Sequence, residues 1–220
     1  MTNSAQARAD ALRAAQQPTG WRGHLKALLG FTTPVSAAAE AEIRDWDAGA
    51  EGERRTAELL RPLGQEGWYG LYDRAVPGAD VANVDFALIA PNGRAFTVDA
   101  KLWSRDGVVR AVNGRLLHGD RPYDRVMPSV LFETRQIEAE LQKELPRTGR
   151  GRTVVTPVIA MHNAPVDGGG FTLEGVRIIP ADRLLGLLRS HAGPPDPQWA
   201  ATVAAAAERI LPRYVEDDDL

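Results

Sequence analysis

The feature that most constrains this chain is residues 83–103, NVDFALIAPNGRAFTVDAKLW, where two strand-like runs flank a Pro-Asn-Gly turn. Proline suits the first central position of a type I turn, and Gly93 suits the left-handed position that closes a three-residue hairpin loop. Such a loop pairs Ala90 with Arg94 and thereby fixes the register of both strands. The segment therefore predicts an antiparallel hairpin formed by residues 84–90 and 95–102.

The predicted register places two acidic side chains, Asp85 and Asp99, directly opposite each other. Opposed side chains have Cβ atoms about 4.5–5.5 Å apart, and two like charges there are destabilising unless a cation or a proton lies between them. Lys101 follows Asp99 by two residues and therefore lies on the same face. The three side chains form either a functional polar cluster or a solvated face on which Lys101 only neutralises the aspartates.

A predicted helix over residues 36–60 adds a third carboxylate. Ala50, Ala57 and other small or apolar residues follow helical spacing, and Glu53 falls on the same stripe. A carboxylate aimed at a core is costly unless it is paired or binds a metal. Gly49 and Gly52 would let the helix backbone approach the sheet or a phosphate. The alternative interpretation is that Glu53 pairs with a nearby arginine.

Composition limits the chemistry that is available. The 220-residue chain has no cysteine, which excludes disulfides and thiolate metal sites and predicts a cytoplasmic protein. Its four histidines are scattered without the spacing of metal ligands: His24, His118, His162 and His191. The net charge is −3, so a nucleic-acid partner would need locally concentrated positive charge. No run approaches the roughly 20 apolar residues that cross a bilayer, so no membrane span is expected.

The remaining chain alternates helix-like and strand-like segments. Strands are expected near 68–74, 153–161 and 176–179, with a further hairpin at 107–118 around Asn113 and Gly114. Helices are expected at 128–145, 181–191 and 196–211. This order predicts an α/β fold with a mixed sheet flanked by helices. We divide it into an N-terminal helical arm (1–35), a main domain (36–192) and a C-terminal helix with an acidic tail (193–220).

Two segments together resemble a known family. GAEGERRTAELL (residues 49–60), followed by NVDFALIAPNGRAFTVDAKLW, is similar to the nuclease-related domain (NERD), a branch of the restriction-endonuclease-like superfamily. The resemblance rests on Gly-x-x-Gly-Glu ending at Glu53, then Asp85, then Asp99-x-Lys101. The family more often has glutamate where this chain has Asp99. The resemblance implies a restriction-endonuclease-like core with a mixed four- or five-stranded sheet. It also implies metal binding by Asp85, Asp99 and Glu53, and a Lys101 that orients the nucleophile.

The resemblance and the acidic residues together predict a nuclease that uses Mg²⁺ or Mn²⁺ to hydrolyse phosphodiester bonds. Magnesium prefers hard oxygen ligands and retains several waters, which suits two or three carboxylates. Lys101 would hold the attacking water, and burial could lower its pKa enough for it to help remove a proton. DNA is favoured over RNA as the substrate. Candidate nucleic-acid contacts are the basic residues Lys143, Arg147, Arg150, Arg152 and Arg105, although charged turns are often only solvated.

Two other functions remain open on the sequence alone. The chain could be a noncatalytic nucleic-acid-binding or regulatory module that retains the fold. It could also be a structural protein that binds a partner through its N-terminal amphipathic segment, residues 21–31.

Overall fold

The computed structural model describes residues 37–79, 82–145 and 152–214, and it describes side chains from residue 48 onward. The chain divides into two compact units, Met1–Glu51 and Gly52–Leu220, and the division falls inside helix α3 (Ala37–Leu60). The predicted N-terminal arm, 1–35, lies outside the described residues. All that follows concerns the second unit.

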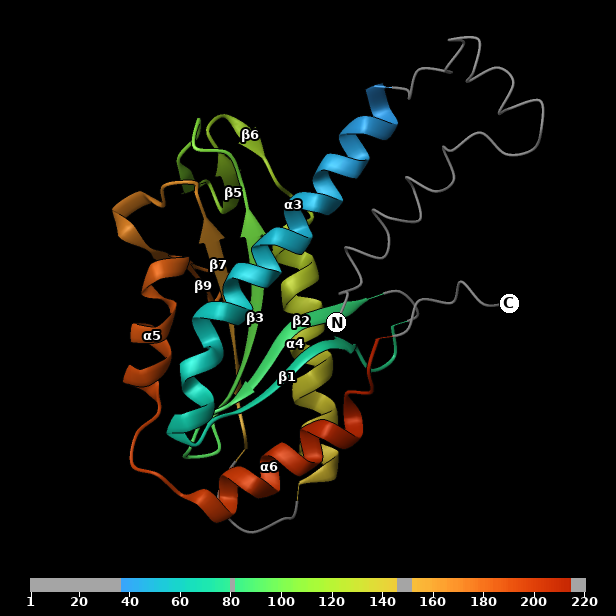
Figure 1. Ribbon diagram of the computed structural model, residues 1–220, viewed down its shortest axis with the longest axis vertical. Helices are drawn as coiled ribbons and strands as arrows, with labels where there is room; N and C mark the ends of the chain where they lie inside the picture. Colours follow the sequence, from blue (N-terminus) through green and yellow to red (C-terminus); the bar gives the residue numbers. More distant parts are fainter. Residues whose placement is uncertain (1–36, 80–81, 146–151, 215–220) are drawn as a thin grey trace, which may run out of the picture. The chain divides into compact units, whose positions relative to one another are not determined.

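One mixed sheet of six strands forms the centre of this unit (Figure 1). In spatial order the strands are β1 (Tyr69–Ala75), β2 (Asn83–Ile89), β3 (Ala95–Leu102), β7 (Val155–His162), β9 (Val176–Pro180) and β8 (Phe171–Leu173). The first three strands are antiparallel, β3, β7 and β9 are parallel, and β8 returns antiparallel to β9. The predicted α/β class is confirmed, and the sheet is larger than the four or five strands that the resemblance implied.

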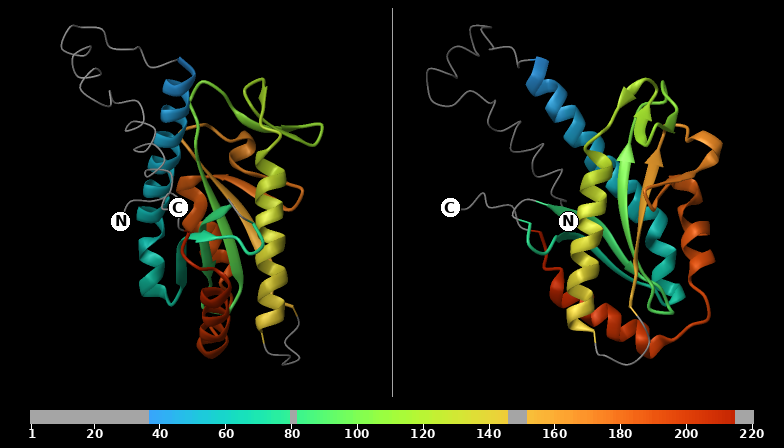
Figure 2. Two further views of the ribbon diagram at one scale, coloured as in Figure 1. Left: turned by 90° about the vertical axis from the view of Figure 1, so that its right-hand side faces the viewer. Right: turned by 180° about the vertical axis from the view of Figure 1, so that it is seen from behind.

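Helices cover both faces of the sheet because successive strand residues point to opposite sides. The even-numbered residues of β3 pack with α5 (Leu184–His191) and with the end of α3, as seen in the cluster of Phe96, Val98, Leu60, Leu184 and Leu188. The other face packs with α4 (Val126–Glu144) and α6 (Pro197–Ile210) through Ile89, Ala95, Ile137, Leu141 and Val203. Figure 2 shows α4 and α5 on opposite sides of the sheet. Short 3₁₀ segments connect these elements: η1 (Arg61–Glu66), η2 (Asp167–Gly169) and η3 (Ala181–Arg183).

A small three-stranded ribbon is inserted between β3 and α4. It comprises β4 (Val109–Val112), β5 (Arg115–His118) and β6 (Arg121–Pro122). Asn113 and Gly114 have φ of 50° and 75°, as a two-residue hairpin turn requires, so the predicted second hairpin is confirmed. The backbone N–H of Val109 donates to the carbonyl of Pro165, 2.8 Å away, and attaches the ribbon beyond the end of β7. The ribbon therefore lies at the end of the sheet where β3 finishes (Figure 1).

Among the described helices, none has both the length and the apolar character required to cross a membrane.

Candidate active site

The hairpin that carries the two aspartates has the predicted turn. The N–H of Ala90 donates to the carbonyl of Arg94 at 2.8 Å, and Gly93 adopts a left-handed φ of 82°. The strands then pair in the predicted register, from Ile89 opposite Ala95 to Phe86 opposite Val98. Asp85, which precedes Phe86, and Asp99, which follows Val98, each lie one position beyond this last pair. They therefore belong to the same row of alternating side chains, on the face covered by α4.

The regular pairing of β2 and β3 ends where the acidic residues begin. The backbone N–H of Ala100 donates to Oδ2 of Asp85 at 2.8 Å, so a side-chain carboxylate accepts the bond from β3 at this point. A backbone N–H is a fixed donor, and this bond holds the Asp85 carboxylate against the backbone of β3 on the side that faces β2. The hairpin thus positions Asp85 through the backbone of the neighbouring strand, independently of solvent.

Asp99 and Lys101 form a partly buried ion pair. Nζ of Lys101 lies 2.7 Å from Oδ1 of Asp99, and the side chains retain only 30% and 18% of their exposure, respectively. The second oxygen of Asp99, Oδ2, is buried and has no hydrogen-bond partner among the described residues. An unsatisfied buried carboxylate oxygen is costly. This oxygen could accept a further hydrogen bond or bind a cation.

Glu53 reaches the same region from α3 because the helix approaches the sheet at Gly52. A Cβ on Gly52 would lie 3.3 Å from Cβ of Leu102, so glycine permits this contact with the end of β3. The packed side of the helix runs through the buried residues Gly52 and Thr56. Ala57 is exposed, so the predicted apolar stripe is wrong at that position, and Glu53 lies half-buried at the edge of the packed face.

The alternative partner for Glu53, a nearby arginine, is not observed among the described residues. Arg54 pairs with Glu58, one turn further along the helix, and Arg55 donates to Asn163 at 3.2 Å. The charges that act on Glu53 are instead those of the aspartates and of Lys101. Glu53 is therefore coupled electrostatically to Asp85 and Asp99, and we call these three carboxylates the acidic cluster.

Burial and mutual repulsion shift the titration of this cluster. Burial, followed by the charges of Asp85 and Asp73, raises the pKa of Glu53 to about 8. Burial and the charge of Asp99 raise the pKa of Asp85 to about 7, although the hydrogen bond from Ala100 opposes the rise. In the absence of a bound cation, the cluster therefore binds protons near neutral pH.

Lys101 shifts in the direction opposite to the one predicted. Burial alone would lower the pKa of its ammonium, but the charges of Asp99 and Asp85 and the hydrogen bond to Asp99 outweigh burial and raise the pKa. Lys101 is consequently a cation at neutral pH. In this state its N–H groups can donate to a water or a phosphate oxygen.

Glu133, on α4, is coupled to this cluster, and the sequence analysis missed it. Burial, followed by the charge of Asp99, raises its pKa to about 8, and the hydroxyl of Ser129 donates to its carboxylate at 2.9 Å. A signal was present: Glu133 lies three residues after Val130 and four before Ile137, both of which are buried. The reasoning applied to Glu53 would also have found this second carboxylate on an apolar helix stripe.

Asp73, on β1, is the other residue that the sequence analysis missed. Its charge contributes to the raised pKa values of both Glu53 and Asp85. Its backbone has a φ of 48°, and its carboxylate accepts a hydrogen bond from the side-chain amide of Asn83 at 2.9 Å. A left-handed non-glycine residue inside a strand is uncommon, and no motif in the sequence indicates it.

A comparison with protein families identifies the family to which this chain belongs. The family model described as nuclease-related domain (NERD) matches residues 48–162, about half of the chain. The chain belongs to the nuclease-related domain family. The match includes α3 from residue 48, the hairpin, the ribbon, α4 and β7, and thus every member of the acidic cluster. Neither the curated proteins nor the solved structures contain a significant match.

The nuclease-related domain presents an oxygen-only donor set that fits a hard divalent cation. The unpartnered oxygen of Asp99 and the raised pKa values of its neighbours are the features expected of carboxylates gathered around a cation site. Within residues 37–79, 82–145 and 152–214, however, no three histidine, cysteine, aspartate or glutamate side chains lie close enough to hold a metal as they stand. Lys101 instead occupies one oxygen of Asp99.

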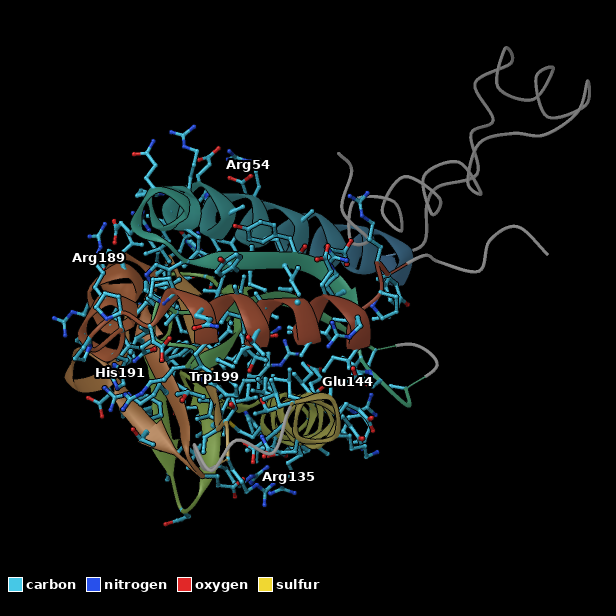
Figure 3. All side chains as sticks on the ribbon, turned by 90° about the horizontal axis from the view of Figure 1, so that it is seen from below. Arg54, Arg135, Glu144, Arg189, His191 and Trp199 are labelled. Atoms are coloured by element: carbon cyan, nitrogen blue, oxygen red, sulfur yellow. The ribbon has the colours of Figure 1, made fainter. Side chains whose placement is uncertain are left out.

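Two of the predicted basic contacts that the structure describes, Lys143 and Arg152, lie away from the acidic cluster and pair with other residues. Lys143 pairs with Glu140, and Arg152 lies 3.5 Å from Glu138. Figure 3 looks onto the end of the sheet where β3 begins, and Glu144, the neighbour of Lys143, lies there. Arg147 and Arg150 fall outside the described residues.

The register of β3 and β7 shows how far the start of β7 lies from the acidic cluster. Ala95 pairs with Val155 and Lys101 with Met161, so six residues, or about 20 Å of strand, separate the start of β7 from the cluster. Arg152 lies before that start. Arg105 is the predicted contact that follows β3 directly, and it is exposed. Nucleic-acid binding by these five residues remains a prediction.

Proposed function

We propose that this nuclease-related domain is a metal-dependent nuclease that hydrolyses phosphodiester bonds, with DNA as the favoured substrate and Mg²⁺ or Mn²⁺ as the cofactor. The observation that carries the proposal is the buried, unpartnered oxygen of Asp99 beside Lys101, Asp85 and Glu53. Family membership supports a nuclease-related function. The absence of cysteine supports a cytoplasmic setting.

Asp85, Asp99 and Glu53 would hold the cation. The hydrogen bond from Ala100 orients Asp85, and the contact with Lys101 orients Asp99, which supports a role for both side chains. A bound Mg²⁺ or Mn²⁺ would lower the pKa of a coordinated water and neutralise charge at the phosphate. Binding of a cation would also displace the protons that the carboxyl groups otherwise retain near neutral pH.

Lys101 acts as a fixed positive charge. Its raised pKa keeps it protonated, so its N–H groups can hold the attacking water or a phosphate oxygen. Glu133 places a further carboxyl group on the α4 side of Asp99. We expect Glu133→Gln, which removes a carboxyl group able to release a proton beside Asp99, to slow cleavage by about tenfold or more, equivalent to about 1.4 kcal/mol of barrier. Glu140→Gln, which changes an exposed ion pair on the same helix, is the matched control.

One observation favours the noncatalytic alternative, a nucleic-acid-binding module of the same fold. In the described residues the carboxylates do not yet converge on a common point, and Lys101 occupies Asp99. The deciding experiment is a cleavage assay on supercoiled DNA, linear DNA, single-stranded DNA and RNA, with Mg²⁺, with Mn²⁺ and with chelator. Cleavage that requires the metal supports the nuclease. Binding without cleavage supports the noncatalytic module, and neither binding nor cleavage leaves a partner-binding protein.

A further inference from the structure

An aromatic residue extends the row of side chains that carries the acidic cluster. The N–H of Trp103 donates to the carbonyl of His162 at 3.3 Å, so the pairing of β3 with β7 continues one residue beyond the end of β3. Asp99, Lys101 and Trp103 alternate along this chain and share one face, about 6.5–7 Å apart. The indole ring is therefore the next side chain after Lys101 on the side of the proposed site.

Trp103 begins a stack of flat groups. Its ring lies 4.1 Å from that of Tyr123, with only 28° between the planes, and His118 packs 5.3 Å from Trp103. The guanidinium of Arg121 covers the Tyr123 ring at 5.1 Å. The three rings are half-buried and Arg121 is exposed, so the stack begins at the main sheet and ends in solvent. We call Trp103, His118, Tyr123 and Arg121 the ribbon stack.

The surface around the ribbon stack is positively charged, in contrast to the whole chain. Residues 103–125 contain five arginines and three aspartates, a surplus of two positive charges in a chain whose net charge is −3. Arg110 and Arg115 are paired with Asp120 and Asp124. The exposed Arg105 and Arg125 form no ion pair with any residue in the described part of the chain.

We infer that the ribbon stack is a binding platform for unpaired nucleotides. Proteins that bind single-stranded nucleic acid combine aromatic or arginine planes, on which bases stack, with positive charge that follows the backbone. The ribbon provides both next to Lys101. Bases inside a duplex already stack on each other and cannot use such a plane, whereas a single strand or an unpaired end can.

This inference deepens the proposed function and rests on it for the position of the scissile phosphate. A phosphate at Lys101 would have its neighbouring nucleotide beside Trp103, so the ribbon stack would select substrates that are unpaired next to the cleavage point. The alternative is that Trp103, His118 and Tyr123 only form the small core that holds the ribbon together, with no nucleic-acid contact.

The test measures binding with chelator present, so that its outcome does not depend on cleavage. The full chain is titrated into a fluorescent single-stranded oligonucleotide and into a duplex of the same length, and both affinities are taken from anisotropy. The variants are Trp103→Leu, which removes the plane, Trp103→Phe, which keeps one, and Arg121→Ala, which alters only an exposed group. Arg177→Ala, which removes an exposed arginine of β9, is the charge control. Thermal melting checks that each variant is folded.

The ribbon stack predicts that Trp103→Leu and Arg121→Ala each weaken single-strand binding by about tenfold, the effect of losing one stacked base, and leave duplex binding unchanged. Trp103→Phe should retain most of the affinity, and Arg177→Ala nearly all of it. Equal losses on both substrates, or no loss in folded Arg121→Ala, would overturn the inference. The cleavage assay proposed above separates this inference from the proposed function. Selective single-strand binding without metal-dependent cleavage would preserve the platform and reject the nuclease. Cleavage with no single-strand preference would do the reverse.

Discussion

The carboxylate of Asp85 accepts the backbone N–H of Ala100, 2.8 Å away, at the point where β2 and β3 stop pairing. An acid at the end of a hairpin is thus locked against the strand that carries Asp99 and Lys101. This bond favours the charged form of Asp85, while burial and Asp99 favour the neutral form and prevail. The hydrogen bond thus fixes the position of Asp85, while burial and the charge of Asp99 make its negative charge unfavourable.

The first prediction concerns the pH dependence of stability without metal. The folded pKa of Glu53, about 8, lies above its usual value of 4.5, so its stabilising contribution is complete at low pH and is lost as pH rises to about 8. Glu53→Gln keeps the shape and removes the charge. Melted in chelator, it should match wild type near pH 5 and melt about 3 °C or more higher near pH 9.

A matched control for this experiment is Glu58→Gln, an exposed glutamate of the same helix. It should follow the wild-type curve across the pH range. Parallel melting curves for wild type and Glu53→Gln would show that Glu53 is not held among the aspartates.

The second prediction concerns the metal. Magnesium that binds only the folded chain should stabilise wild type by RT ln(1 + [L]/Kd), about 2.7 kcal/mol at a hundredfold excess over Kd. Asp99→Asn should gain little. In chelator the same variant should melt at or below wild type, because it loses the ion pair with Lys101. The readout is the melting temperature of both proteins with and without Mg²⁺, and equal shifts would exclude Asp99 as a ligand.

The third prediction concerns the approach of α3 to the sheet. A Cβ at Gly52 would lie 3.3 Å from Leu102, and the larger side chain of Gly52→Leu would force the helix away from β3. The expected cost is about 1–3 kcal/mol, with reduced metal binding as Glu53 moves. Gly64→Ala is the control, since a Cβ there has no neighbour within 4 Å. Denaturant unfolding compares the two, and equal stability would show that the contact does not position Glu53.

The fourth prediction concerns the basic segment 147–152, which lies just before β7 in the sequence. The start of β7 lies about 20 Å from Lys101, a span of roughly six base pairs at 3.4 Å each. Replacing Arg147, Arg150 and Arg152 with alanine should weaken binding of a 20-base-pair duplex and reduce its salt slope. It should leave binding of a four-nucleotide strand unchanged. Anisotropy at several salt concentrations measures both, and an unchanged slope on the long duplex would show that this segment does not contact the substrate.

How far the sequence predicts this site depends on whether the signal is local. The Pro-Asn-Gly turn specifies its own register, so the placement of Asp85 and Asp99 follows from counting. Glu53 follows from helix periodicity combined with the family resemblance. The bond between Asp85 and Ala100 does not follow, because it depends on where the strands separate, which only tertiary packing decides.

Other features required the fold itself. The sequence shows that Glu133 lies on an apolar helix stripe, but only the packing of α4 over the face that carries Asp99 brings it to the cluster. The pKa of Lys101 was predicted in the wrong direction because burial was considered without the number of carboxylates around it. The N-terminal arm, the domain boundaries at 35 and 192, and the basic contacts remain predictions.

The central claim is that the acidic cluster with Lys101 cleaves phosphodiester bonds. The most direct test is the cleavage rate of wild type, Lys101→Ala and the carboxylate control Asp182→Ala, an exposed residue of η3, in Mg²⁺ and in chelator. We expect metal-dependent cleavage by wild type and Asp182→Ala, and a loss of about a hundredfold or more in Lys101→Ala, because removing a group that holds the nucleophile costs several kcal/mol of barrier. Equal cleavage by purified Lys101→Ala and wild type, or cleavage that persists in chelator, would contradict the account.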